Sequence, residues 1–303
     1  MTAGTAGDPS LTLPPTVSLR TTPSGLDVLS VENAHGTAEV YLQGAHVTAW
    51  TPAGHEPVLW LSSASAFAPG VPVRGGIPVC FPWFGAREGH PDAPAHGYAR
   101  RSVWTLEAAH EEAGATVLRL ALPAPEDDDL AGLGGLDASY EVRVGQTLEV
   151  ALTVTSRRDV PVRFEEAQHT YLRVRDVEAT TVHGLEDVAY LDKAAPSGTA
   201  PRRGPDGVPL VPSGQVDRVY LGTSAPVRVV DATRTVQVTK TASQSTVVWS
   251  PGAEVAAGMG DMGTGEWRQM LCVETANVGA HAVELEPGAS HTLRSSYAVS
   301  PRG

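Results

Sequence analysis

Three titratable side chains stand in apolar or strand-like surroundings, where a charge is costly. His169 lies in FEEAQHTYLRV, Glu274 in MLCVETANVG and Asp217 in QVDRVYLG. Burying such a group costs free energy unless it has a hydrogen-bonding partner or a chemical task. An ionised glutamate accepts a proton at neutral pH, and a histidine donates and recovers one. These residue types therefore suit general acid–base catalysis.

Each of the three side chains also has a purely structural interpretation. His169 can be an ordinary hydrogen-bonded histidine, and Glu274 a surface group at a strand end. Asp217 can be an ion-pair partner of the adjacent Arg218. Spacing along the chain does not bring the three groups together, so both interpretations stay open.

An arginine-rich segment with many glycines, prolines and aromatics runs from Val73 to Arg101. Its arginines outnumber its acids Glu88 and Asp92, although the whole chain is acidic. Fork-shaped donors on irregular backbone favour an anionic ligand, and flat aromatic faces are typical of sugar sites. The alternative is a solvated loop over ordinary core aromatics. The residues concerned are Arg74, Arg87, Arg100 and Arg101, with Phe81, Trp83, Phe84 and Tyr98.

Composition excludes several classes of function. The formal net charge of -12 and the isoelectric point near 5.2 argue against nucleic-acid binding, which depends on neutralising phosphates. No apolar run approaches the roughly 20 residues that span a bilayer, and the first residues lack the pattern of a signal peptide. We therefore expect a cytoplasmic protein without a membrane partner, whose Cys80 and Cys272 are buried, reduced thiols.

The elements that must position these groups are predicted to be strands. Apolar and polar residues alternate around residues 118–122 and 148–154, and further β-rich runs occur at 28–31, 227–230, 236–238 and 247–249. Turn-forming clusters separate them, and helical periodicity is scarce. The sequence predicts an all-β antiparallel sandwich as a single domain over residues 16–303, preceded by a flexible tail over residues 1–15.

Two segments are expected to be irregular. The acidic run at residues 126–129 reads as a solvated loop, because it lacks the alternating ligands of a calcium loop. Residues 196–214, rich in proline and glycine, are predicted to form a long connection.

The sequence contains no recognisable metal-binding motif. The ten histidines are scattered, and no His-Glu-x-x-His or paired Cys-x-x-Cys motif occurs. Neither a metal nor a cofactor is expected.

Six strings in order carry a family resemblance over about residues 25–300: RGGIPVCFPWFG, HGYARRSVW, AQHTYLRV, VDRVY, VVWSPG and MLCVETANV. This series resembles the hexose-6-phosphate mutarotases, or glucose-6-phosphate 1-epimerases, of the aldose 1-epimerase superfamily. The resemblance implies a galactose-mutarotase-like antiparallel β-supersandwich that binds a pyranose without metal or cofactor. It also implies interconversion of the α and β anomers of a hexose 6-phosphate, with D-glucose 6-phosphate as the expected substrate.

The resemblance also assigns roles to individual residues. His169 of the HTY string is similar to the family's general acid, and Glu274 of the CVE string to its general base. The chain departs from the family pattern at Gln168, where an aliphatic residue is usual, and in the string WSPG that begins at Trp249.

Four further residues are implied to bind the substrate. His96 and Asp217 would contact sugar hydroxyls, and Arg74 and Arg100 would hold the phosphate. The partner expected is therefore a small sugar phosphate, bound by a monomer. Three alternatives stay open: a neutral galactose or glucose mutarotase, a non-catalytic carbohydrate-binding module, and a glycoside hydrolase. The last would need Asp217 and Glu274 as two carboxylates about 5 to 9.5 Å apart.

Overall fold

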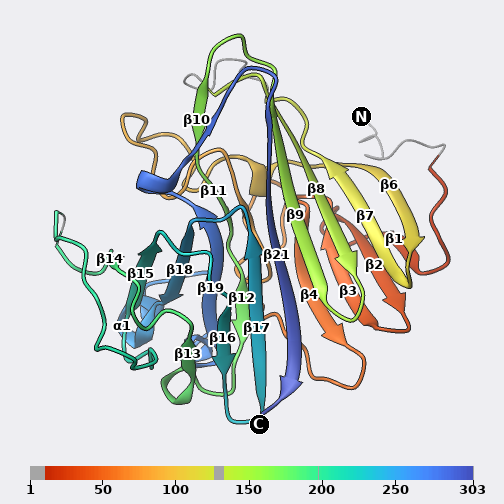
Figure 1. Cartoon of the computed structure of the whole chain (residues 1–303). Helices are drawn as coiled ribbons and strands as arrows, with labels where there is room; N and C mark the ends of the chain where they lie inside the picture. The colour runs from red at the N-terminus through yellow and green to blue at the C-terminus, as the bar shows by residue number, and fades with distance from the viewer. Residues whose placement is uncertain (1–10, 126–132, 197, 303) are drawn as a thin grey trace.

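The computed structural model describes residues 11–125, 133–196 and 198–302 and shows a β protein with few helical turns (Figure 1). Every pairing between its named strands is antiparallel. The predicted all-β antiparallel fold is confirmed. None of the helices in the described part of the chain has the length and apolar character needed to cross a membrane.

The largest sheet has eight strands and contains the long C-terminal strand β21, drawn in dark blue in Figure 1. Alternate residues of its middle strands are buried, and directly paired residues such as Tyr140 and Leu152 share the buried face. In spatial order its strands are β13 (Thr181–His183), β16 (Val227–Val230), β17 (Arg234–Thr241), β21 (Ser290–Pro301), β9 (Leu148–Ser156), β8 (Leu136–Val144), β7 (Ala115–Ala121) and β6 (Thr105–Glu112).

A seven-stranded sheet carries the candidate site residues Asp217 and Glu274, and His169 lies between two of its strands. Its strands, in spatial order, are β14 (Tyr190–Asp192), β15 (Val216–Leu221), β18 (Ser245–Ser250), β19 (Met270–Asn277), β11 (Glu166–Gln168) and β5 (Val79–Cys80), and β12 (Tyr171–Arg173) also pairs with β19. All eight residues of β19 are buried, and β19 pairs with β18 on one side and with β11 and β12 on the other.

Two smaller sheets complete the β structure. One contains β1 (Val17–Thr21), β2 (Asp27–Asn33), β3 (Gly36–Tyr41) and β4 (His46–Pro52); the other pairs β10 (Val162–Phe164) with β20 (Val283–Leu285). The short helices are α1 (Gly252–Ala257) and the 3₁₀ turns Ala99–Arg101, Val177–Ala179, Glu266–Gln269 and Gly279–His281.

One apolar core joins the three larger sheets. Strand β19 packs on β21, while β2 packs on β7 and β3 on β8. Trp50 of β4, Leu120 of β7 and Tyr297 of β21 belong to the same cluster of fully buried side chains. Of the tail predicted over residues 1–15, residues 1–10 lie outside the described residues, whereas Leu11 and Leu13 pack against this core.

The segments predicted to be strands are strands. The runs at 28–31, 148–154, 227–230, 236–238 and 247–249 lie within β2, β9, β16, β17 and β18, and most of 118–122 lies in β7. The acidic run at 126–129 lies outside the described residues. The connection predicted at 196–214 joins β14 to β15.

Candidate active site

His169 and Glu274 come together where the pairing along β19 is interrupted. Strands β11 and β12 both pair with β19, and His169 lies between them. Its Nδ1 lies 3.3 Å from Oε1 of Glu274. The approach lacks hydrogen-bond geometry, since Nδ1 of His169 and Oε2 of Glu274 have no hydrogen-bond partner in the described part of the chain. The two side chains are 7% and 1% exposed.

Strand alternation explains which side chains surround this pair. Cys272 and Glu274 are two residues apart on β19 and therefore share one face of the sheet. Trp249 of β18 and Tyr171 of β12 both pair directly with Cys272, which places them on the same face. The His169 ring stacks on Tyr171 with centroids 4.8 Å apart, and Trp249 meets it edge-on at 6.3 Å. Aromatic walls thus fix the imidazole plane.

Burial controls the charge state of the pair. Burial, reinforced by the positive charges of Arg100 and Arg74, lowers the pKa of His169 well below its usual value. Burial, reinforced by Asp217, raises the pKa of Glu274 well above its usual value. Both directions favour a neutral pair that carries one transferable proton. The neutral pair and the ion pair differ only by moving that proton across the short gap between His169 and Glu274.

Two glycines shape the turn that carries Arg74. A Cβ atom on Gly75 would lie 2.4 Å from the carbonyl oxygen of Trp60, and one on Gly76 would lie 2.3 Å from that of Val47. The Gly75 carbonyl accepts a 2.8 Å hydrogen bond from Nε2 of the buried His46. The turn therefore lies tightly between neighbouring strands and fixes the base of the arginine.

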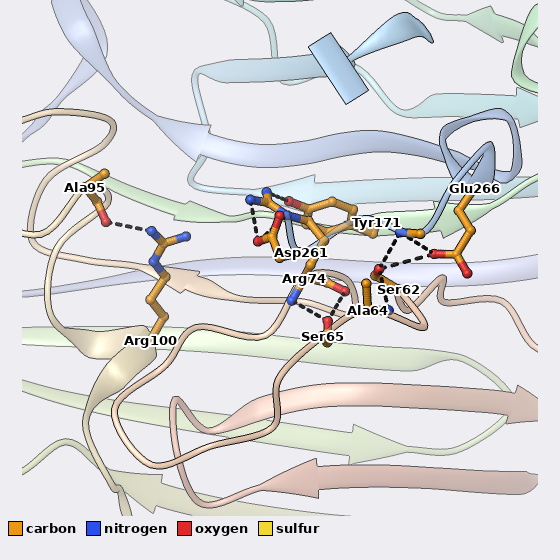
Figure 2. Close-up of polar contacts among 10 residues, drawn as sticks. Ser62, Ala64, Ser65, Arg74, Ala95, Arg100, Tyr171, Asp261 and Glu266 are labelled. Carbon is orange, nitrogen blue, oxygen red and sulfur yellow. Dashed lines mark hydrogen bonds and ion pairs between the residues drawn. The ribbon is translucent and has the colours of Figure 1, made fainter. Parts of the chain in front are cut away.

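The Arg74 guanidinium is already engaged, as Figure 2 shows. Its Nε and Nη2 lie 3.0 and 2.9 Å from Oδ2 of Asp261, and its Nη1 donates to the Tyr171 hydroxyl at 2.9 Å. The loop that carries Asp261 is held nearby by Glu266, which accepts hydrogen bonds from Ser62 and Gly263 (Figure 2).

Arg100 differs from Arg74 because no carboxylate of the described residues pairs with it. Its Nη2 donates to the Ala95 carbonyl at 2.8 Å, and its buried Nε has no hydrogen-bond partner (Figure 2). It acts electrostatically on both His169 and Glu274. Arg100 therefore brings an uncompensated positive charge to the site.

His96 faces the same region from the turn that precedes Arg100. Its ring lies 5.6 Å from the His169 ring, and its Nδ1 accepts a hydrogen bond from the Gly85 amide at 3.2 Å. Burial and the two arginines lower its pKa to about 3, so the ring is neutral. A neutral ring whose Nδ1 accepts must carry its proton on Nε2, which leaves that atom as a donor.

Asp217 lies on β15, directly opposite Trp249 of β18. Burial raises the pKa of its carboxyl group, and its charge is one cause of the raised pKa of Glu274. The alternative pairing with Arg218 is not formed among the described residues; the Arg218 guanidinium lies over the Tyr190 ring at 4.4 Å. The fold therefore brings the six predicted site residues to one region of the molecule.

Comparison with known proteins shows the family to which the chain belongs. The sequence pattern described as aldose 1-epimerase matches residues 27–298, which is most of the chain. The chain belongs to the aldose 1-epimerase family.

Curated relatives in the aldose 1-epimerase family match over most of their length. An Escherichia coli protein named "Putative glucose-6-phosphate 1-epimerase" is 36% identical over 255 residues, covering 83% of each chain. A protein of the same name from Cenchrus ciliaris is 33% identical over 299 residues, covering 95% of this chain and 89% of its own. A solved structure named "putative mutarotase", from Salmonella typhimurium, superposes with a TM-score of 0.87 at 30% identity, covering 96% of each chain.

Sequence reasoning missed Asp261 and the thiol of Cys272 as neighbours of this candidate site. Asp261 lies in a glycine-rich loop after α1, where an aspartate resembles any solvated loop acid. The sequence did contain a clue to Cys272: it precedes Glu274 by two residues, and alternate residues of a strand share one face. Cys80 and Cys272 are both buried and unpaired.

Proposed function

We propose that this chain interconverts the α and β anomers of a hexose 6-phosphate, with D-glucose 6-phosphate as substrate. The observation that carries the proposal is the buried His169–Glu274 pair, 3.3 Å apart, beside Arg100 with no carboxylate partner among the described residues. Family membership supports the anomerisation, and the names of the curated relatives support the phosphorylated substrate.

Ring opening needs one base and one acid. The reactive form is the one in which the shared proton has moved from Glu274 to His169. Glu274 then accepts the proton of the C1 hydroxyl while His169 protonates the ring oxygen; the bond between C1 and the ring oxygen breaks and C1 becomes an aldehyde. C1 then rotates, the oxygen attacks its other face, and each proton returns to its donor. Each positioned acid or base contributes typically about 10²- to 10⁴-fold.

The remaining predicted residues orient the sugar. Nε2–H of His96 donates to a sugar hydroxyl or ring oxygen, and the Asp217 carboxylate accepts from hydroxyl groups. Trp249 offers an aromatic face on the same side of the sheet as Glu274. The phosphate at C6 is held by Arg100 and by the part of Arg74 that faces away from Asp261.

A neutral-sugar mutarotase is the second candidate, and the Asp261 carboxylate favours it. Asp261 partly neutralises Arg74, so only Arg100 offers its full charge to an anion. The choice between the two candidates therefore depends on whether Arg100 selects a phosphorylated sugar.

Exchange NMR between the α and β anomeric protons tests the function. Parallel samples contain glucose 6-phosphate, glucose and galactose, without added metal. We expect faster exchange on the phosphate ester than on the free sugars, and a loss of at least about 10²-fold in His169→Ala and in Glu274→Gln. Enhancement confined to the free sugars would support the second candidate, and no enhancement on any sugar would leave a binding module.

A matched pair of arginine variants tests the phosphate assignment. Arg100→Ala should raise KM for glucose 6-phosphate by about 10- to 100-fold, as expected for losing a charge-assisted contact of about 1.5 to 3 kcal/mol, and leave glucose nearly unchanged. Arg101→Ala is the control, because this neighbour is exposed and donates to the Gly70 carbonyl. An equal loss on both sugars in Arg100→Ala would reject the phosphate assignment.

A further inference from the structure

A buried thiol stands beside the catalytic pair and has no part in the proposed reaction. One ring nitrogen of His169, Sγ of Cys272 and one carboxylate oxygen of Glu274 all lie within 4.8 Å of one another. All three residues are buried. Nitrogen, sulfur and oxygen donors in one cluster make a donor set that protein sites use for zinc.

We infer that His169, Cys272 and Glu274 form an inhibitory site for a thiophilic divalent cation, of which Zn²⁺ is the best match. Three protein ligands leave one tetrahedral position for water or a sugar oxygen. The inhibition rests on the proposed anomerase function, whereas the binding of the metal does not.

The geometry of the cluster is close to that of a coordinated ion. With metal–ligand bonds of about 2.0 to 2.3 Å, neighbouring ligands of a tetrahedral zinc lie about 3.3 to 3.6 Å apart. Nδ1 of His169 and Oε1 of Glu274 already stand 3.3 Å apart without a hydrogen bond between them. The remaining ligand distances need to shorten by at most about 1.5 Å from the 4.8 Å limit of the cluster.

Unpartnered polar atoms and charge balance also favour a cation. Nδ1 of His169 and Oε2 of Glu274 are buried without hydrogen-bond partners among the described residues, so a metal satisfies atoms that the folded chain leaves unpaired. A dication, a thiolate, a carboxylate and a neutral imidazole sum to zero charge. Two protons leave to solvent when the metal binds, one from the Cys272 thiol and one from the neutral His169–Glu274 pair. Arg74 and Arg100 lie nearby and oppose a cation, while they stabilise the two anionic ligands.

Coordination would stop the reaction by occupying its base. Lone pairs of Glu274 that bind a metal cannot accept the C1 hydroxyl proton, and a coordinated His169 cannot turn to the ring oxygen. Sugar and metal therefore compete for the same atoms.

Cobalt(II) is the direct probe of binding, because its spectrum reports the ligand set independently of turnover. We expect the wild-type chain to bind one Co²⁺ with visible bands of tetrahedral intensity and a near-ultraviolet thiolate-to-cobalt band. Cys272→Ser should lose the thiolate band. Cys80→Ser, which removes the other buried thiol from outside the cluster, should keep it. A spectrum without that band in the wild type, or one retained in Cys272→Ser, would overturn the site.

Zinc titration of the anomerisation rate tests the consequence. Zn²⁺ should inhibit the wild type and Cys80→Ser at equal concentrations, reversibly with a chelator. Cys272→Ser, compared with its own metal-free rate, should need a Zn²⁺ concentration at least about tenfold higher for the same inhibition. Mutating a residue that only supports a metal ligand already lowers metal affinity by about 10- to 100-fold, and losing an anionic ligand should cost at least as much. Equal inhibition of Cys272→Ser and the wild type would reject the proposal. A metal-free chain that catalyses nothing would instead reject the proposed function and leave the cobalt result standing.

Discussion

Asp261 sets the charge that Arg74 offers to a ligand. Two nitrogens of the guanidinium reach the same carboxylate oxygen, at 3.0 and 2.9 Å. The Asp261 side chain is 42% exposed, so the pair adds little to the stability of the fold. In the proposed function its main effect falls on ligand binding, because the carboxylate would repel a phosphate dianion and compete with it for Arg74.

Replacing Asp261 by asparagine should therefore improve phosphate recognition. The amide keeps an acceptor for Arg74 but removes the negative charge, so we expect KM for glucose 6-phosphate to fall by about three- to tenfold, equivalent to roughly 1 kcal/mol for an exposed charge. KM for glucose should stay constant. Steady-state anomerisation of both sugars measures this, and a higher KM for the phosphate ester would instead assign Asp261 to substrate binding.

At the residue scale, the sequence proposed His169 and Glu274 as the acid–base pair but did not predict their geometry. His169 and Glu274 were recognisable from their strings, whereas their 3.3 Å approach depends on pairing between β11, β12 and β19, which are far apart in sequence. The contact between Arg74 and Asp261 could not be predicted from the sequence either. Asp261 lies in a loop, where no apolar periodicity indicates which way a side chain points.

The turn formed by Arg74, Gly75 and Gly76 sets the position of the Arg74 side chain, and Gly76 is its most constrained residue. Gly76 has φ +65°, and a Cβ there would lie 2.3 Å from the Val47 carbonyl and 2.7 Å from Nε2 of His46. An alanine would have to displace a strand and the histidine that holds the turn.

Gly76→Ala should therefore lower both stability and activity. Gly54 is the matched control: it has φ +78°, and a Cβ there would have nothing within 4 Å, so Gly54→Ala costs only the left-handed strain of about 1 to 2 kcal/mol. Urea unfolding should show a larger loss for Gly76→Ala than for Gly54→Ala. Equal losses would mean that the close approach at Gly76 relaxes at no cost.

A second element-scale contact joins the seven-stranded and eight-stranded sheets. Nε2 of His291 on β21 lies 2.8 Å from Oε1 of the fully buried Glu166 on β11, and Asn277 donates to the same oxygen at 2.8 Å. The hydrogen bond to Glu166 raises the pKa of His291. A raised folded pKa contributes stability that is complete below the unfolded value of about 6.5 and is lost as pH rises through the folded value.

His291→Gln should thus destabilise the protein in a pH-dependent manner. We expect it to lower the free energy of unfolding by about 2 kcal/mol at pH 6, as for a hydrogen bond to a charged group, and by clearly less at pH 9. Urea denaturation of both proteins at the two pH values gives the difference. The same loss at pH 6 and pH 9 would show that the contact does not depend on the charge of His291.

Among the elements, long strands with one buried face were predictable and very short ones were not. β9 shows the alternation over nine residues, which is enough for a period of two to emerge. β5, β11 and β12 have only two or three residues, and their strand geometry comes from pairing with β19 or with each other. These three short strands frame the site, so tertiary pairing decides the part that matters most for function.

At the scale of the whole molecule, the proposed anionic substrate meets a chain of net charge -12. The overall field repels a phosphate dianion, so selective binding must come from local charge such as that of Arg100.

The candidate site is also part of the common core: β19 packs on β21, and Tyr171 and Tyr297 lie in the same buried cluster. If the proposed ligand binds at His169, its binding is therefore expected to be linked to unfolding of the sheets as a unit.

Thermal unfolding with ligand should report this linkage. A ligand that binds only the folded chain stabilises it by about 2.7 kcal/mol at a hundredfold excess over its Kd. We expect glucose 6-phosphate to raise Tm more than glucose at the same concentration, because Arg100 contributes only to the phosphate ester. In Arg100→Ala the difference between the two sugars should shrink to the part that Arg74 supplies, while Arg101→Ala should behave like the wild type. Equal shifts in the wild type would show that the local charge does not overcome the field of the whole molecule, and would favour a neutral sugar.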